Sequence, residues 1–155
     1  MVAIFAAACA TSKKTELETT PESGAIDTLN VIAVPVGLNL DRDPGPDSFS
    51  VKVYANTPER PKAVPLKKGT LEILTFDGTF FGRTNLPPLL RTWTFDSAKL
   101  EPYKFKAHIG IGYEFTLGWG TNKPTHTLMS IAARYTNPSG QVITSRPSAV
   151  TVFDK

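Results

Sequence analysis

Few side chains in this 155-residue chain could carry metal or redox chemistry: there are one cysteine and two histidines. His108 and His126 lie eighteen residues apart, and Cys9 stands far upstream in a polar stretch. A zinc site needs converging Cys, His or carboxylate ligands. We therefore predict no metal site and no cofactor, and a single cysteine allows no intrachain disulfide.

The acidic run DRDPGPD over residues 41–47 is the best match to a cation site, because Asp41, Asp43 and Asp47 carry oxygen ligands. The calcium loop of an EF-hand places ligands at positions 1, 3 and 5 and a Glu at position 12. Here position 5 is Gly45 and position 12 is Lys52. Asp, Pro and Gly are also the residues of a tight turn, which we favour.

Catalytic patterns are equally sparse. The chain has no G-x-S-x-G nucleophile elbow and no glycine-rich phosphate loop. Glu72, Glu114 and Asp77 could act as a hydrolase's paired carboxylates if the fold brought them together. Glu72 and Glu114 fall on the solvent side of alternating strands, so we expect no enzyme and keep a hydrolase as the least favoured alternative.

Aromatic residues offer a different chemistry, the stacking of a ligand. Phe80 and Phe81 are adjacent, so one of the two rings points away from the core if the stretch TFFGRT is extended. With Arg83 and the following NLPPLL they form the longest irregular connection, and such loops often bind ligands. Trp119 ends a strand and could line the rim. The candidate ligand contacts are therefore Phe81, Arg83 and Trp119. Packing over the sandwich edge is the alternative for the two phenylalanine rings, and core packing is the default for Trp119, which shares the apolar parity of its strand.

Composition and charge narrow the class of protein. Seventeen basic and fourteen acidic residues are interspersed, whereas nucleic-acid binders cluster their basic residues. We expect no nucleic-acid partner. No apolar run approaches the roughly 18 residues of a membrane-spanning helix. Thirteen Pro and eleven Gly favour short strands joined by turns.

The elements that would position these residues are strands. The segment 107–119 is the clearest, because its odd positions are apolar and its even positions are small or polar. Gly110 and Gly112 fall on the outer face and permit a bulge or the close approach of another backbone. Further strands are expected at 31–40, 49–55, 70–76, 90–95, 127–136, 141–145 and 148–153, with one helical turn at 96–101.

Proline and glycine positions add two local predictions to this strand pattern. Pro35 indicates an edge position or a bulge in the segment 31–40, and NPSG at 137–140 predicts a type I turn. Seven or eight strands at this spacing predict an antiparallel β-sandwich with immunoglobulin-like, Greek-key connections, with a closed barrel as the alternative. The domain should comprise residues 26–155, after an apolar segment at 1–9 and a polar linker at 10–25.

Several stretches resemble a group of uncharacterised secreted or lipid-anchored proteins of planctomycete-type bacteria. They are GLNLDRDPGPDSFSVKVYA, GTLEILTFDG, LRTWTFDSAKLEPYKF, IGIGYEFTLGW and AARYTNPSGQVITSRPSAVTV, within residues 31–152. The last of these also resembles the final hairpin of immunoglobulin-like and fibronectin type III-like domains, although the Cys–Trp–Cys pattern of the former is absent. The resemblance implies export and a β-sandwich, and it brings no catalytic residues.

The start of the chain resembles a truncated bacterial lipoprotein signal. Such signals end in small residues before the lipid-bearing cysteine, as Ala6, Ala7 and Ala8 precede Cys9 here. Leu is missing three residues before Cys9, no basic residue precedes the apolar block, and the block is short. A start codon placed too far downstream explains the last two departures. The alternative is an N-terminal tail with a chance cysteine.

These observations lead to one expected function and one main alternative. We expect a non-enzymatic lipoprotein of the cell envelope, attached through Cys9, with a binding or structural role towards an unknown protein or glycan. Because Ala10 follows the cysteine, the outer membrane is favoured, with a periplasmic or secreted location as the alternative. A carbohydrate-binding module that uses exposed aromatic rings is the alternative function.

Overall fold

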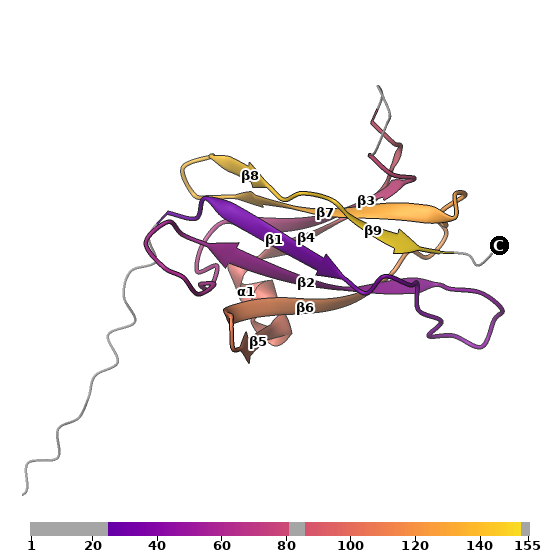
Figure 1. Ribbon diagram of the computed structural model, residues 1–155, viewed down its shortest axis with the longest axis horizontal. Coiled ribbons are helices and arrows are strands. Elements are labelled where there is room, and N and C mark those ends of the chain that lie inside the picture. The colour runs from indigo at the N-terminus through magenta and orange to yellow at the C-terminus, as the bar shows by residue number, and fades with distance from the viewer. Residues whose placement is uncertain (1–24, 81–85, 153–155) are drawn as a thin grey trace, which may run out of the picture.

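Two antiparallel sheets stack face to face in the computed structural model, which describes residues 25–80 and 86–152 (Figure 1). One sheet has the order β1-β2-β6-β5, and the other has the order β4-β3-β7-β8 with β9 also paired to β7. Side chains from both inner faces fill the space between the sheets. This arrangement confirms the predicted all-β sandwich.

The bounds of the elements follow the sequence pattern closely in most places. In the first sheet they are β1 Thr28–Ala33, β2 Ser48–Asn56, β5 Lys104–Ala107 and β6 Gly110–Gly118. In the second they are β3 Thr70–Asp77, β4 Leu89–Asp96, β7 Leu128–Thr136, β8 Val142–Thr144 and β9 Ser148–Thr151. A short helix α1, Ser97–Leu100, and a 3-10 turn η1, Glu101–Tyr103, connect β4 to β5.

The sheet order is that of an immunoglobulin-like domain. β8 and β9 pair with successive parts of β7, so they act as one last strand interrupted around Pro147. If β1 to β7 are lettered A, B, C, C′, D, E and F in chain order, and β8 with β9 is strand G, the two sheets have the orders A-B-E-D and C′-C-F-G. Greek-key crossovers connect them. The predicted topology is therefore correct.

The segment 107–119 differs from its prediction, because it is a hairpin rather than one long strand. β5 ends at Ala107, the chain turns at His108 and Ile109, and β6 begins at Gly110 with φ +120°. Ile109 is consequently exposed although its parity matched the core. This hairpin is one reason why residues 25–80 and 86–152 contain nine strands instead of seven or eight.

The predicted close approach of another backbone is confirmed at Gly110. Ala63 forms a parallel bridge with Gly110, donates its N–H to Ile109, and accepts a hydrogen bond from Ile111. A Cβ atom on Gly110 would collide with the Ala63 backbone. Glycine is thus required here for both its conformation and its lack of a side chain.

Pro35 marks the point where the first strand ends. β1 stops at Ala33, and the chain beyond crosses to the other sheet, where Val36 pairs in parallel with Thr151 of β9. Thr151 donates its N–H to Pro35 at 2.8 Å and accepts from Gly37 at 2.7 Å. The expected strand over 31–40 is therefore the end of β1, followed by isolated bridges from Val36 to β9 in the second sheet and from Leu38 to β2 in the first.

The predicted helical turn and hairpin turn are both present. The Asp96 carboxylate accepts the N–H of Lys99 at 2.9 Å and caps α1. The α-helix ends at Leu100, and Pro102 lies in the 3-10 turn that follows. In the β7–β8 turn, Gly140 donates its N–H to Asn137 at 3.0 Å, as a type I turn requires.

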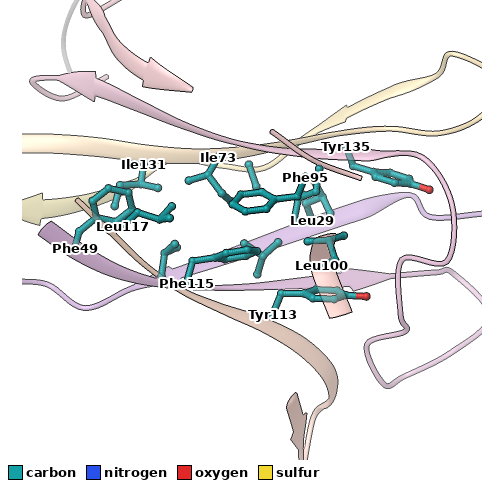
Figure 2. Packing of buried hydrophobic residues seen from close by; sticks show 14 of the residues in the cluster. Leu29, Phe49, Ile73, Phe95, Leu100, Tyr113, Phe115, Leu117, Ile131 and Tyr135 are labelled. Carbon is teal, nitrogen blue, oxygen red and sulfur yellow. The ribbon is translucent and has the colours of Figure 1, made fainter. Parts of the chain in front are cut away.

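The core lies between the sheets (Figure 2). Phe95, Tyr103 and Phe115 pack ring against ring, with centroids 4.7–5.4 Å apart. Leu100 of α1 is 2% exposed and closes the core beside β5. Each large buried apolar side chain contributes about 1.5–3 kcal/mol to folding, so the core needs no disulfide.

The sandwich has two chemically different ends. At one end lie the first described residues, the β2–β3 crossover at 57–69, the segment 97–109 and the turn at 137–141; we call it the entry end. At the other lie the connections 34–47 and 119–127, the described residues 78–80 and 86–88 between β3 and β4, and the end of β9; we call it the loop end. Figure 1 shows the entry end on the left and the loop end on the right.

Candidate functional site

The described parts of the predicted ligand-contact region lie at the loop end. Cys9, Phe81 and Arg83 fall outside the described residues. Phe80 packs edge-on against Phe76 of β3, with ring centroids 5.0 Å apart. Phe80 therefore packs against the sheet.

Trp119 does not have the exposed ring that ligand stacking requires. Its side chain is 1% exposed and lies beneath Gly37 at the start of the β1–β2 loop. Its indole nitrogen is buried without a hydrogen-bond partner among the described residues. The prediction of a rim contact at Trp119 is wrong, because the 34–47 loop covers the strand end that the sequence alone leaves open.

The β6–β7 connection is tied to the edge strand β4. Arg91 of β4 places its guanidinium over the Trp93 ring at 4.9 Å and donates to Gly118 at 3.3 Å. Asn122 donates its side-chain amide to Leu90 at 3.1 Å. These contacts join the two sheets at the loop end.

Asp77 is the most heavily used polar side chain of this end. Its carboxylate accepts the N–H groups of Thr125 and His126, each at 3.0 Å, and the hydroxyl of Thr125 at 2.5 Å. The Nδ1 atom of His126 lies 3.1 Å from the same carboxylate. Burial raises the pKa of Asp77, but these hydrogen bonds outweigh it and hold the pKa below its ordinary value.

The arrangement around Asp77 is that of a loop anchor. Its oxygens are occupied by groups of the 125–126 segment, and the aspartate itself is 6% exposed. His108 lies at the entry end, so the two histidines are not brought together. Within residues 25–80 and 86–152, no group of three or more His, Cys, Asp and Glu side chains is placed to hold a metal.

The acidic run at 41–47 folds as a turn closed on itself. The Asp47 carboxylate accepts the N–H groups of Leu40 and Asp41 at 2.8–3.1 Å, and Asp41 accepts the N–H of Asp43 at 2.9 Å. The bond from Leu40 is the main cause that lowers the pKa of Asp47. These oxygens serve the backbone of the loop.

The three carboxylates considered for hydrolysis are separated by the fold. Glu72 lies on the outer face of the second sheet and pairs with Arg134 at 2.6 Å. Glu114 lies on the outer face of the first sheet and pairs with Lys52 at 3.5 Å. Asp77 lies at the loop end, so the paired arrangement of a glycosidase does not form from these residues.

Exposed aliphatic side chains distinguish the loop end. They include Val36 at 53%, Leu40 at 66%, Leu86 at 77% and Leu89 at 54%. A groove of about 380 Å³ opens beside the first of these and is lined by Val36, Gly37, Asn39, Gly45, Pro46, Thr151 and Val152. Single exposed apolar side chains are common on folded domains, and they indicate a contact surface where they gather into one patch.

Sequence reasoning missed these aliphatic residues. Leu40 and Leu86 were visible as large apolar residues inside Pro-, Gly- and Asp-rich connections, which is the signal that could have identified them. Val36 was assigned to a strand, and its exposure follows from the switch between sheets after Pro35.

Comparisons with known proteins add little. No protein-family model matches the chain, and no curated protein matches it. Among solved structures it is similar to MtrC from Shewanella baltica OS185, with a TM-score of 0.39 and 13% identity. The match covers 80% of this chain and 22% of MtrC, so this chain spans about a fifth of that protein. Likeness at this level assigns no function. No described helix is long and apolar enough to cross a membrane.

Proposed function

We propose that this chain is a non-enzymatic β-sandwich of the cell envelope, tethered through a lipid on Cys9, which binds a partner protein with its loop end. The observation that carries the proposal is the opposition of the two ends. The N-terminal segment joins the domain at the entry end, where Asp27 donates its N–H to Asn56 at 3.1 Å. The described loop residues that carry the exposed side chains lie at the opposite end of both sheets, which Figure 1 shows on the right.

The length of the N-terminal segment suits a tether. The sixteen residues 10–25 reach at most about 55 Å when extended. As a flexible coil they span roughly 20–25 Å. A domain held at its entry end by such a segment leaves its loop end free to meet a partner.

The chemistry of the loop end favours a protein partner over a glycan. Its exposed large side chains among the described residues are aliphatic, and sugar recognition relies on exposed aromatic rings. Trp119, one of the two rings proposed for a sugar platform, is buried. The groove at this end is lined in part by the apolar side chains of Val36, Pro46 and Val152, and an apolar centre is typical of protein interfaces.

The partners of the three candidate catalytic carboxylates support the proposal of a non-catalytic role. Glu72, Glu114 and Asp77 each have a structural partner in the sandwich. Each of these interactions stabilises a strand pair or a loop.

The test separates attachment from partner binding. Chain isolated from the cells that make it should fractionate with membranes, and Cys9→Ala should release it into the soluble fraction. Crosslinking at the loop end should then give a defined adduct that Leu40→Asn with Leu86→Asn removes. The matched pair Ile109→Asn with Val142→Asn, at the entry end, should retain it. A soluble wild-type chain would refute attachment, and equal loss in both pairs would refute the loop-end site.

A further inference from the structure

Lysines gather at the entry end. Six of the eight lysines in the described residues lie there, and all six are exposed: Lys62, Lys67, Lys68, Lys99, Lys104 and Lys106. With Arg60 they make seven basic side chains, against the four acidic side chains Asp27, Glu59, Asp96 and Glu101. At the loop end the described residues reverse this balance, with Asp41, Asp43, Asp47 and Asp77 against Arg42, Arg91 and Lys123.

The basic side chains come from three segments that the fold brings together. Lys67 of the β2–β3 crossover and Lys104 of β5 line one groove of about 480 Å³, together with Ser97 and Glu101. Lys62 precedes Ala63, whose backbone forms hydrogen bonds with Ile109 and Ile111 of the β5–β6 hairpin. In the same hairpin, Lys106 is the pairing partner of Ile111. The lysines are therefore neighbours in space although they span 45 residues of sequence.

Part of this charge is not neutralised within the domain. Lys99 pairs with Asp96, and Lys104 pairs with Glu101. No ion pair among the described residues involves Lys62, Lys67, Lys68 or Lys106. These four ammonium groups are available to an external anion.

Two tyrosines hold the backbone that carries Lys67 and Lys68. The Tyr113 hydroxyl accepts the N–H of Leu66 at 2.8 Å, and the Tyr135 hydroxyl donates to Lys68 at 2.7 Å. Both rings are buried in the core, one from each sheet. The lysine pair is thus presented on a fixed segment.

From this arrangement we infer that the entry end is a docking face for an anionic phospholipid surface. The tether of the proposed function attaches at the same end, so a lipid on Cys9 would hold these lysines within reach of the headgroups. Each Lys or Arg near an anionic leaflet adds to membrane affinity, and a basic patch is the usual second signal beside acyl chains. The orientation rests on the proposed function, whereas the affinity for anionic lipid does not.

The test uses the full chain with Cys9→Ser, so that no acyl chain contributes. Its partition onto vesicles of phosphatidylglycerol and phosphatidylcholine in equal parts is compared with partition onto pure phosphatidylcholine. We expect binding to the anionic vesicles alone, and its loss on raising the salt from about 0.05 to 0.5 M, because screening shortens the reach of these charges. Binding to both kinds of vesicle would overturn the inference.

Two variants of equal net charge locate the face. Replacing Lys62, Lys67 and Lys106 with Gln should lower partition roughly tenfold or more. The control replaces Arg42, Lys52 and Lys123 with Gln and should stay within about twofold of the parent. Equal effects in the two variants would overturn the inference, because they would show a response to net charge alone.

Three further outcomes distinguish lipid from nucleic acid as the partner, and the docking face from the proposed lipid attachment. Binding to a short DNA duplex that the first variant loses, with no binding to anionic vesicles, would replace lipid by nucleic acid as the partner. Acylation of Cys9 together with unchanged partition of the first variant would refute this face and leave the proposed function intact. An unmodified Cys9 together with lysine-dependent vesicle binding would refute the lipid attachment of the proposed function and leave this docking face intact.

Discussion

At the scale of single residues, Asp77 shows how a polar group can look catalytic in sequence and prove structural. It follows a strand, sits beside a glycine and lies next to a histidine in space. Its hydrogen bonds join the end of β3 to the loop before β7, which are 48 residues apart. This long-range contact sets the position of the loop end.

Asp77→Asn should destabilise the domain by about 1–3 kcal/mol at pH 7, because an amide cannot accept from all of the donors that face it. Because the pKa of Asp77 is lowered in the folded protein, its contribution to stability is full above the ordinary aspartate pKa and is lost as the pH falls through the folded pKa. The difference in the free energy of unfolding between parent and variant, measured with denaturant, should therefore be smaller at about pH 3 than at pH 7.

Asp43→Asn is the control for this prediction, because Asp43 is exposed and its own N–H donates to Asp41. It should change stability by less than about 0.5 kcal/mol at either pH. A variant at Asp77 as stable as this control would contradict the role of Asp77 as an anchor.

Trp119 shows where residue-level prediction fails. Its parity at the end of 107–119 correctly placed its ring on the core side. Whether a strand's last residue lies on the rim or beneath a loop depends on which loop folds over it, here the segment around Gly37. That segment is 82 positions away in the sequence, so spacing alone carried no signal.

At the scale of elements, alternation and turn residues identified most strands. The strands β2, β3, β4 and β7 match their predicted segments to within one or two residues, because their inner faces alternate regularly. The pattern failed at 107–119, where the alternation continued through a tight turn that the positive φ of Gly110 makes possible. The two outer glycines were the visible sign of that turn.

Gly110→Ala provides a direct check of this account. The substitution meets both an unfavourable φ and the backbone of Ala63. Gly45 has a similar φ of +101° but no atom within 4 Å of an added Cβ. We expect Gly110→Ala to cost at least about 1–2 kcal/mol more than Gly45→Ala in denaturant unfolding. Equal costs would show that φ alone matters and that the contact with Ala63 does not.

The two tyrosine hydroxyls at the β2–β3 crossover make a second prediction at this scale. Tyr113→Phe and Tyr135→Phe should each cost about 1 kcal/mol, since each removes one hydrogen bond to the crossover backbone. Tyr103→Phe is the control, because its hydroxyl makes no hydrogen bond within the described part of the chain. Losses as small as that of the control would contradict the anchoring of the crossover.

These two tyrosines also make the stability of the fold depend on pH in a defined direction. Burial raises the pKa of Tyr113 and the pKa of Tyr135 above the ordinary value of a tyrosine. Their neutral forms therefore stabilise the fold fully below pH 10, and that contribution is lost as the pH rises through the folded pKa values. Alkaline unfolding should be shallower in the double Tyr→Phe variant than in the parent.

At the scale of the whole molecule, the sandwich is polarised. Its entry end is basic and receives the N-terminal segment, and its loop end carries exposed aliphatic side chains. The sequence showed charges of both signs interspersed along the chain, and the gathering of lysines from three segments appears only when the strands are paired. The proposed lipid tether and the proposed partner surface fall on opposite ends of this polarised sandwich.

The mass of the N-terminal peptide, in chain isolated from the membranes of cells that make it, tests the central claim most directly. The account predicts a peptide that begins at Cys9 and carries a diacylglyceryl group on sulfur, with residues 1–8 removed. A peptide that continues upstream through Ala8 with an unmodified Cys9 would contradict the account.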